Sequence, residues 1–438
     1  MKINYSDKVQ LFALVLLAFF LPLWRLGSSI GFALVVLHWF YEGDWRNKWP
    51  KLKHNYFFWG TSFLFLLYLL SAVVYHDKQS MFELEKRIGL FLIPTVLLSS
   101  SSIKERKSII LYVFLLGVLF LDLRALGGIL YHYMTAASFN LSQGGQVNTI
   151  IHHERPYVGA FSALGLAFTL LFYREKKGNK YLPLIAGSIF IITVFIISAK
   201  LAMGMILVLL MIFLLLQLGR KSILYLLGVL AFGCSTYFWI PSVHNRFSDL
   251  IEKKNEPRLF IWPSAIKAIP SNPFNHIYGT FSEKNTEIAL NKEYKKETQI
   301  ALQTASRWEV IAYLKKNKLD SEFDFNVPYD IKDYSKGKWW WLYADKKNFN
   351  THNQFLGIYL SYGLLGLLSI GFMIYGLSIQ LARYRNYYLL FSIIVIFLFL
   401  LFENILAKQQ GVFMFGLFLS LFYTQPSNKA YSSIHIHV

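Results

Sequence analysis

Long apolar runs recur along almost the whole chain, and short polar connections separate them. The runs are continuous rather than alternating, and a helix of about 20 residues crosses a hydrocarbon layer roughly 30 Å thick. The pattern therefore predicts an all-α polytopic membrane protein rather than a barrel. We expect about twelve transmembrane helices, at residues 9–24, 26–41, 56–75, 88–102, 108–134, 156–173, 181–198, 199–218, 221–241, 355–382, 386–402 and 410–424.

The composition indicates the same class of protein. Of the 438 residues, 55% are hydrophobic and 18% are aromatic, which is more apolar surface than one water-soluble core can bury. No small-residue cleavage site follows the first run, so we expect this run to remain as a helix. Cys234 is the single cysteine, which excludes an intrachain disulfide and a thiolate metal cluster.

The net charge of +19 lies mainly in short clusters between the apolar runs, a distribution that argues for membrane topology rather than nucleic-acid binding. Alternate connections carry these clusters, as expected where Lys and Arg concentrate in cytoplasmic loops. We therefore expect a multi-pass protein of the bacterial inner membrane with both termini in the cytoplasm. The basic residues are Arg46, Lys48, Lys51, Lys53, Lys104, Arg106, Lys107, Arg174, Lys176, Lys177, Lys180, Arg220, Lys221, Arg383 and Arg385.

One long polar segment interrupts the apolar runs and is predicted to lie outside. The chain then divides into residues 1–241 with spans one to nine, a periplasmic loop at 242–354, and residues 355–438 with the last three spans and a cytoplasmic tail. Within the loop we expect an amphipathic helix at 256–270, with Leu259, Trp262, Ile266 and Ile269 on its apolar face, and a charged helix near 286–317. Three consecutive tryptophans, 339–341, suit an interfacial aromatic belt better than sugar stacking.

Five cations map to the outer ends of spans, against the charge rule: Arg87, Arg155, Lys200, Arg258 and Lys408. Any one of them alone is best explained as a snorkelling side chain. Five on one face, at a depth where an unpaired charge is costly, indicate a shared anionic ligand. The pyrophosphate of a lipid-linked precursor suits that depth, since Arg binds phosphate bidentately and Lys binds it as a point charge.

His352 opens the tenth span on the same outer face. The positive end of a helix dipole favours a neutral imidazole, which is able to act as a base toward an acceptor hydroxyl. A lone histidine there more often caps a helix or lines an interface, and only its cationic company favours a functional role. His152 and His153, just before Arg155 and Tyr157, are secondary candidates for donor or acceptor contacts.

Metal and nucleotide chemistry find no support in the sequence. The acidic stretch at 320–333 lacks the spacing of a calcium loop and suits a solvated face. Neither a phosphate-cradling glycine loop nor a dinucleotide fingerprint is present. We expect no metal ion and no cofactor.

The residues around His352 resemble a known family. The sequence His352-Asn353-Gln354-Phe355-Leu356, with Tyr362-Gly363-Leu364-Leu365-Gly366 after it, is similar to the signature that opens a late transmembrane helix in bacterial O-antigen ligases and O-antigen polymerases. Weaker matches follow the family order: 84–87 with Pro94, 198–200, and 258–262 running on to Pro273 and Gly279. Lys200 stands where the family usually has arginine, which keeps the charge but loses the bidentate fork.

The resemblance implies a GT-C-type, metal-independent, inverting glycosyltransferase. Its donor would be a glycan on undecaprenyl pyrophosphate and its acceptor, in ligases, the lipid A-core. His352 would deprotonate the acceptor hydroxyl, while Arg258 and Lys200, with Arg87, would stabilise charge on the leaving pyrophosphate. Substrate binding would involve Arg87, Arg155, Tyr157, Asn353 and Lys408.

Other functions share parts of this pattern. A polymerase or a protein O-oligosaccharyltransferase would use the same donor with another acceptor, and the long loop before span ten favours the ligase. A lipid-linked glycan transporter or flippase is the alternative from another class. It should show two pseudo-repeated halves and polar residues near the membrane midplane. Only Asp122 and Arg124 stand out within a span, and no repeat is evident.

Overall fold

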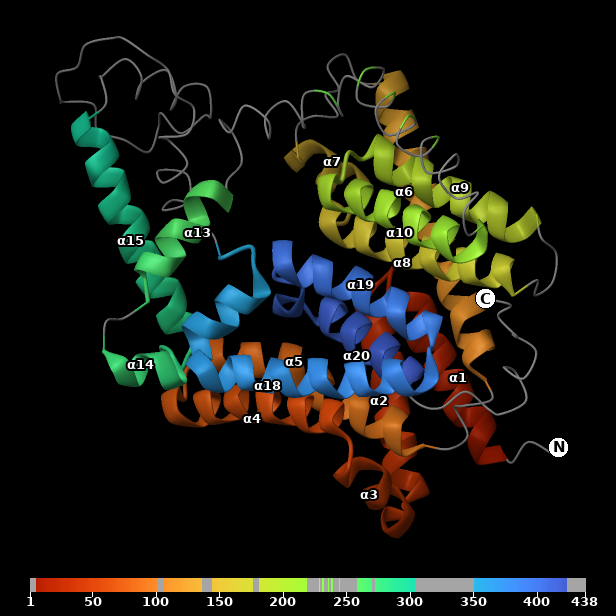
Figure 1. Ribbon diagram of the computed structural model, residues 1–438, viewed down its shortest axis with the longest axis horizontal. Helices are drawn as coiled ribbons and strands as arrows, with labels where there is room; N and C mark the ends of the chain where they lie inside the picture. Colours follow the sequence, from red (N-terminus) through yellow and green to blue (C-terminus); the bar gives the residue numbers. More distant parts are fainter. Residues whose placement is uncertain are drawn as a thin grey trace. The chain divides into compact units, whose positions relative to one another are not determined.

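The computed structural model describes residues 5–100, 106–135, 144–175, 181–218, 258–269, 272–304 and 350–423, with residues 228, 231, 235, 238 and 244. These residues form helices joined by turns, with no strand among them (Figure 1). The predicted ninth span, the three tryptophans and the acidic stretch lie wholly or almost wholly outside the described residues.

The chain forms two compact units. We call residues 1–246 with 368–438 the membrane unit, and residues 247–367 the loop unit. The membrane unit contains α1 (Tyr5–Phe20), α2 (Arg25–Glu42), α3 (Trp45–Lys53), α4 (Tyr56–Tyr75), α5 (Lys78–Ser99), α6 (Lys107–Thr135), α7 (Gly144–Ile151), α8 (Arg155–Arg174), α9 (Tyr181–Ile196), α10 (Lys200–Leu218), α19 (Tyr387–Phe402), the 3-10 turn η5 (Ile405–Ala407) and α20 (Gln409–Tyr423). The loop unit contains α13 (Arg258–Lys267), α14 (Pro273–Tyr278) and α15 (Glu283–Thr304), and the two units share α18 (Gln354–Tyr384).

Five of the described helices are long and apolar enough to cross a membrane: α4, α6, α8, α10 and α18. Three shorter apolar helices, α9, α19 and α20, accompany them. The described part of the chain is all-helical, and its apolar helices indicate a multi-pass membrane protein, as the sequence predicts. The observed helices begin and end within a few residues of most predicted spans. The fourth differs most, because α5 extends ten residues further toward the N-terminus than the run 88–102.

The core of the membrane unit centres on α8 and α20, which are buried along nearly their whole lengths. Phenylalanine rings pack between them. The ring centre of Phe418 lies 4.5 Å from that of Phe114 in α6 and 5.2 Å from that of Phe168. A buried polar pair lies in the same core, where the Ser162 hydroxyl of α8 donates to Asp122 of α6 at 3.0 Å. This hydrogen bond satisfies the one acidic residue that the sequence places within a span.

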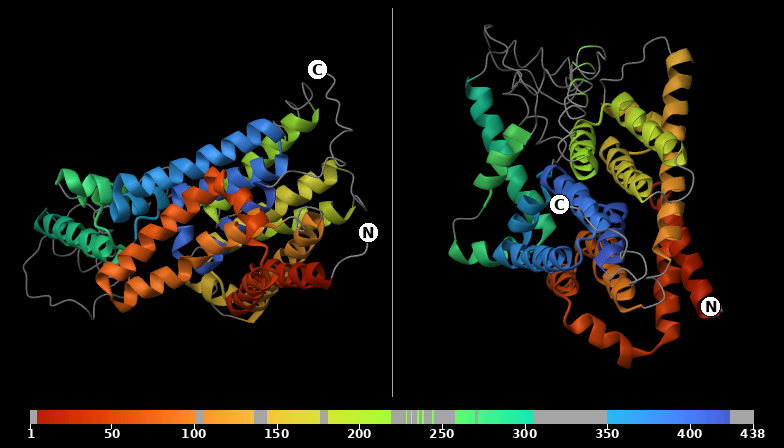
Figure 2. Two further views of the ribbon diagram at one scale, coloured as in Figure 1. Left: turned by 90° about the horizontal axis from the view of Figure 1, so that it is seen from below. Right: turned by 45° about the vertical axis from the view of Figure 1, so that its right-hand side comes forward.

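Alternate turns of the membrane unit gather at two ends. At one end, which we call the basic end, Lys51 donates to the Ser99 carbonyl at 2.8 Å and Arg106 to the Asp7 carbonyl at 2.6 Å. Tyr112 stacks on Phe172 there, so the start of α6 meets the end of α8 (Figure 2). The opposite end, which we call the pocket end, joins the α1–α2 turn, the α7–α8 turn and the η5–α20 turn. The grouping agrees with the predicted alternation of basic and non-basic connections.

Small residues let α4 and the second half of α18 lie side by side (Figures 1 and 2). A side chain at Gly60 would place its Cβ 2.6 Å from the Ser369 carbonyl, and one at Gly376 would lie 2.6 Å from the Phe57 nitrogen. Close backbone approach of this kind is the common basis of helix packing in membranes.

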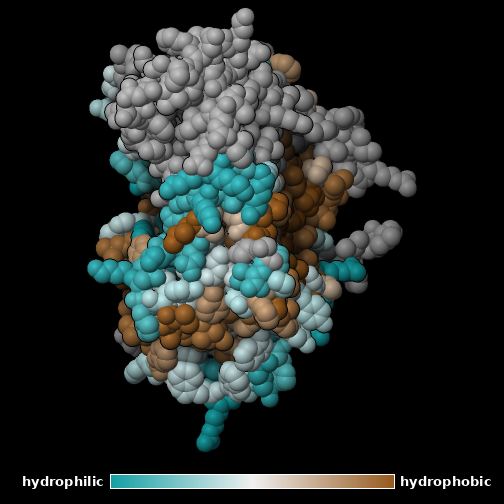
Figure 3. Space-filling view, turned by 90° about the vertical axis from the view of Figure 1, so that its left-hand side faces the viewer, coloured by the Kyte–Doolittle hydropathy of each residue, from teal (hydrophilic) through white to brown (hydrophobic). Residues whose placement is uncertain are grey.

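The loop unit packs around one apolar cluster. Ile261 and Ala265 of α13 meet Leu290 and Tyr294 of α15 and Leu360 of α18. The predicted amphipathic helix is present as α13. Its predicted residues Trp262 and Ile269 pack against the cluster, whereas Ile266 is exposed and its place is taken by Ile261 and Ala265. The other side of α15 carries exposed lysines, and hydrophilic side chains gather on the face in Figure 3.

Candidate functional site

The backbone around His352 forms a tight, hydrogen-bonded turn before α18. His352 adopts a left-handed conformation with φ 44°, and its amide donates to the Asn350 side chain at 2.9 Å. The Thr351 hydroxyl donates to the Asn353 carbonyl at 2.8 Å. A non-glycine residue at positive φ is uncommon and is held there by its surroundings. The turn therefore fixes the backbone position from which the His352 side chain extends.

Asn353, predicted as a substrate contact, caps α18. Its side-chain oxygen accepts from the Leu356 amide at 2.9 Å, as an N-cap residue does. His352 accordingly lies one residue before the cap rather than within the helix. The cap uses one lone pair of the Asn353 oxygen, and the side-chain nitrogen remains a donor.

The helix that carries Arg258 is docked against the His352 turn. The Trp262 indole donates to the Thr351 carbonyl at 3.0 Å, and Thr351 directly precedes His352. Arg258 is the first residue of α13 and lies one helical turn before Trp262. Two of the three predicted catalytic residues thus belong to contacting elements of the loop unit.

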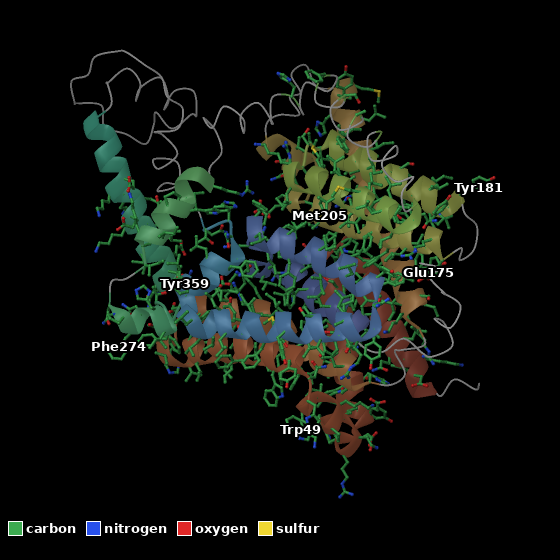
Figure 4. The ribbon with its side chains drawn as sticks, in the orientation of Figure 1. Trp49, Glu175, Tyr181, Met205, Phe274 and Tyr359 are labelled. Carbon is green, nitrogen blue, oxygen red and sulfur yellow. The ribbon has the colours of Figure 1, made fainter. Side chains whose placement is uncertain are left out.

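The first half of α18 is also held by α14. Tyr359, which Figure 4 labels, lies on α18. Its hydroxyl and His276 Nδ1 form a hydrogen bond at 2.7 Å. At the next turn the helix kinks at Gly363, where φ is 59°, and a Cβ there would lie 2.5 Å from the Ile277 carbonyl. The family-like glycine therefore marks a backbone crossing.

A cavity of about 500 Å³ opens at the pocket end of the membrane unit. Three turns contribute its walls: the α1–α2 turn, the α7–α8 turn and the η5–α20 turn. Its lining residues are Leu23, Trp24, Arg25, Asn148, Thr149, His152, His153, Glu154, Tyr157, Lys408 and Gln410. Of the predicted substrate-binding residues, Tyr157 and Lys408 line it.

Lys408 is paired across the cavity with Glu154, and both side chains are about half exposed. Its ammonium also lies 5.6 Å from the centre of the Tyr157 ring. The Tyr157 hydroxyl donates to the Ile405 carbonyl at 3.1 Å, which ties α8 to η5. The predicted cation therefore has a counterion within the protein, and Tyr157 supports the wall.

His153 is a neutral member of the same wall. Burial, and after it the charge of Arg124, lower the pKa of His153 to about 4. Its Nδ1 accepts from the Glu154 amide at 3.1 Å. From the sequence alone His153 is a secondary candidate, because no motif distinguishes it.

Two further predicted cations, Arg87 and Arg155, are buried among other protein side chains. Arg87 is fully buried in α5, ion-paired with Glu83 and 4.4 Å from the centre of the Tyr68 ring. Arg155 is 5% exposed, and its amide donates to the Asn148 side chain at 3.1 Å. Neither lines the cavity.

Lys200 begins α10 at the same end of the membrane unit. It follows a turn in which Ser198 has φ 52°. A Cβ at Gly159 of α8 would lie 2.7 Å from Ala202 and 3.2 Å from Ala199, so the first turns of α8 and α10 are in close contact. The structure thus brings Lys200 to the end of the unit where Arg155 begins α8.

Arg25 was missed by the sequence analysis. Its Nε donates to the Gln409 side chain at 2.9 Å, and the Ser29 hydroxyl donates to the same oxygen at 3.3 Å. The signal was available, because Arg25 lies between the first two predicted spans, on the side where the charge rule predicts few cations. Gln409 and Glu154 had no such signal.

No group of three His, Cys, Asp or Glu side chains able to hold a metal ion occurs within the described ranges. No protein-family model matches the chain, and no curated protein matches it. The likeness to O-antigen ligases and polymerases accordingly rests on the short motifs around Arg87, Lys200, Arg258 and His352 and on the order in which they occur.

Proposed function

We propose that the chain is a GT-C-type glycosyltransferase of the bacterial inner membrane. It transfers a glycan from undecaprenyl pyrophosphate to a hydroxyl of the lipid A-core, as an O-antigen ligase does, without metal or cofactor. The observation that carries the proposal is the Trp262 hydrogen bond to Thr351, which fixes the Arg258 helix against the turn bearing His352. A base and an anion-binding group are thereby organised in one packed unit.

The reaction follows from these roles. His352 accepts the proton of the acceptor hydroxyl, whose oxygen attacks the anomeric carbon with inversion, and the bond to the pyrophosphate breaks. Arg258 and Lys200 neutralise the charge that develops on the pyrophosphate. No nucleotide is consumed, because the lipid pyrophosphate itself is the leaving group. The left-handed turn at His352 supports this role, since strained backbone concentrates at functional sites.

The substrate-binding residues divide into two groups by their surroundings. Tyr157 and Lys408 line the cavity, where Lys408 meets the substrate and Tyr157 forms the wall beside it. Arg87 and Arg155 are buried, and we assign them to holding the helices that shape the site. Asn353 contributes its amide nitrogen while its oxygen caps α18.

The proposal includes a topology. The basic end faces the cytoplasm with both termini, the chain crosses the membrane twelve times, and residues 242–354 lie in the periplasm together with the pocket end. The separation of the two ends in the membrane unit supports this orientation, since cytoplasmic loops are the ones enriched in Lys and Arg.

The test begins with the purified protein in nanodiscs, a glycan on a prenyl pyrophosphate, and lipid A-core as acceptor. Arg258→Ala and Lys200→Ala should abolish or sharply reduce transfer, whereas Lys200→Arg should be tolerated because it restores the fork. Arg46→Gln, which removes an exposed charge from α3, is the matched control and should transfer at the wild-type rate. Normal transfer by both alanine variants would refute the assigned anion site.

Deleting the gene distinguishes the related activities. Loss of a ligase removes all polymer from the lipopolysaccharide, whereas loss of a polymerase leaves a core bearing one repeat. A protein O-oligosaccharyltransferase would leave lipopolysaccharide unchanged and remove glycan from protein. A transporter would form no new glycosidic bond in the nanodisc assay.

A further inference from the structure

The wall of the cavity at the pocket end contains hydrogen-bond donors that have no acceptor among the described residues. The Arg25 Nε donates to the Gln409 side chain, and the two terminal nitrogens of Arg25 have no partner among the described residues. Gln409 is itself fixed by Ser29, and the neighbouring Gln410 side chain donates to the Leu21 carbonyl at 3.1 Å. An exposed arginine is thus oriented by a network, with its bidentate edge left available.

His153 supplies a second donor of known direction. A backbone amide is always a donor, so the hydrogen bond from the Glu154 amide makes Nδ1 of His153 an acceptor. In the neutral ring the proton then resides on Nε2. Within the described residues Nε2 has no hydrogen-bond partner, and His153 lines the cavity. His153 is therefore equipped to donate to a ligand and is not a base on that nitrogen.

Lys408 supplies the third donor, and its Glu154 counterion is replaceable by a bound anion. Its ion pair with Glu154 is about half exposed on both sides, and such pairs contribute little net stability. An anion in the cavity competes for the ammonium at low cost. With Arg25, Lys408 and Glu154 all ionised, the cavity wall carries a net charge of about +1, which favours an anion.

The three donors come from three separate turns and converge on one cavity. A planar carboxylate has two oxygens for such donors, whereas a tetrahedral phosphoryl group offers three. The wall also contains Leu23 and Trp24, and Trp24 is 52% exposed. An apolar and aromatic wall beside an anion site suits an amphiphile with a phosphorylated head.

We propose that this cavity binds a phosphoryl group, with Arg25 as the bidentate ligand, Lys408 as the point charge and His153 Nε2 as a neutral donor. The inference rests on the proposed function in taking that group to be the diphosphate of the lipid-linked donor. A membrane-lipid phosphate offers the same chemistry, and the experiment separates the two sources.

The experiment is calorimetric titration of the full-length protein in phosphatidylcholine nanodiscs. The probes are farnesyl diphosphate, inorganic pyrophosphate and inorganic phosphate. Farnesyl diphosphate should bind most tightly. Arg25→Gln should weaken its binding by at least about tenfold, since a hydrogen bond to a charged group is lost. His153→Phe should weaken it by about two- to tenfold, and His153→Gln, which keeps an N–H donor, should restore most of it.

Arg46→Gln is the matched control, and its affinity should equal that of the wild type. Thermal unfolding of Arg25→Gln should also match the wild type, because Arg25 is exposed and its loss leaves the core intact. Repeating the titration in phosphatidylglycerol nanodiscs identifies the source. If farnesyl diphosphate binds equally tightly in both kinds of nanodisc, the cavity is assigned to the diphosphate. If phosphatidylglycerol weakens its binding to the wild type but not to Arg25→Gln, the cavity is assigned to a lipid headgroup.

Two results would overturn the inference: no binding of any probe in either nanodisc, or equal affinity in the wild type and Arg25→Gln. Both are independent of catalysis. Binding that depends on Arg25 in a protein without transfer activity leaves this site standing and removes the proposed function. Transfer with wild-type kinetics by Arg25→Gln would show that the phosphoryl group bound here is not the donor's diphosphate, and it would leave the proposed function standing.

Discussion

The backbone of His352 determines which substitutions are informative there. At φ 44° glycine is free of strain and asparagine is tolerated, whereas alanine bears the cost of a left-handed residue. We predict that His352→Ala lowers the free energy of unfolding by about 1 kcal/mol relative to His352→Gly. Thermal unfolding of the two variants measures this difference. Equal midpoints would show that the turn relaxes to an ordinary conformation.

His153 predicts a pH dependence of stability. Burial lowers its pKa from 6.5 to about 4, so between these values the unfolded chain takes up a proton that the folded chain excludes. Stability is therefore fully present above pH 6.5 and is lost as the pH falls, by up to about 1.4 kcal/mol per pH unit. Unfolding midpoints of His153→Gln between pH 7 and pH 4.5 should fall less than those of the wild type. His54→Gln, which removes an exposed histidine, should keep the wild-type slope.

At the residue scale the sequence named residues whose surroundings only packing shows. Tyr157 and Lys408 line the cavity as predicted binding residues, yet Lys408 has a counterion in Glu154 that lies 254 positions away in the chain. Arg87 and Arg155 were selected by charge and depth, and burial shows what charge alone does not. Pairing between distant turns depends on packing, which no local pattern encodes.

Among the elements, α18 offers a sharp test of its kink. Gly363→Ala places a Cβ at positive φ against the backbone of Ile277, so we predict a loss of at least about 1–2 kcal/mol in stability. Gly371→Ala in the same helix meets nothing within 4 Å and should be neutral or stabilising by up to about 1 kcal/mol. Unfolding in detergent measures both. Equal effects would mean that the crossing at Gly363 is not formed.

The docking of α13 is tested through its tryptophan. Trp262→Phe keeps an aromatic ring but removes the donor to the Thr351 carbonyl. We predict that transfer falls between about tenfold and a hundredfold, because small displacements of a catalytic group have effects of that size. Trp49→Phe, on an exposed position of α3, is the control. Wild-type transfer by Trp262→Phe would separate the Arg258 helix from the chemistry.

The long elements were predictable and the short ones were not. Helices such as α4 and α8 match their apolar runs because the thickness of a membrane sets their length. By contrast α3, α7 and α14 have six to nine residues and no long apolar run, and the sequence analysis missed them. Packing against neighbours stabilises such short helices, as where His276 of α14 forms a hydrogen bond with Tyr359 of α18.

At the scale of the whole molecule, the reactivity of introduced cysteines tests the proposed topology. In a Cys234→Ser background, Lys295→Cys on exposed α15 should react with an impermeant maleimide in spheroplasts. Arg46→Cys near the basic end should react only after permeabilisation. The reverse pattern would invert the protein in the membrane and move every assigned site to the cytoplasm.

The periplasmic loop stays a prediction from hydropathy, whereas the loop unit is defined by packing. The loop predicted at 242–354 compares with a loop unit at 247–367, and the difference arises because the first turns of α18 pack with α13 and α15. Hydropathy assigns those turns to the membrane region, whereas Leu360 belongs to the loop-unit core. Hydropathy therefore does not show that α18 belongs to two units, because the whole helix is apolar.

The most direct test of the proposed chemistry is the initial rate of His352→Asn. Asparagine tolerates the left-handed turn and keeps hydrogen bonding, but it does not act as a base. With a glycan on a prenyl pyrophosphate and lipid A-core in nanodiscs, we predict a loss of about 10²- to 10⁴-fold across neutral pH, with donor binding retained. Near-normal turnover by His352→Asn would contradict the account, because the proton of the acceptor would then be removed by another group.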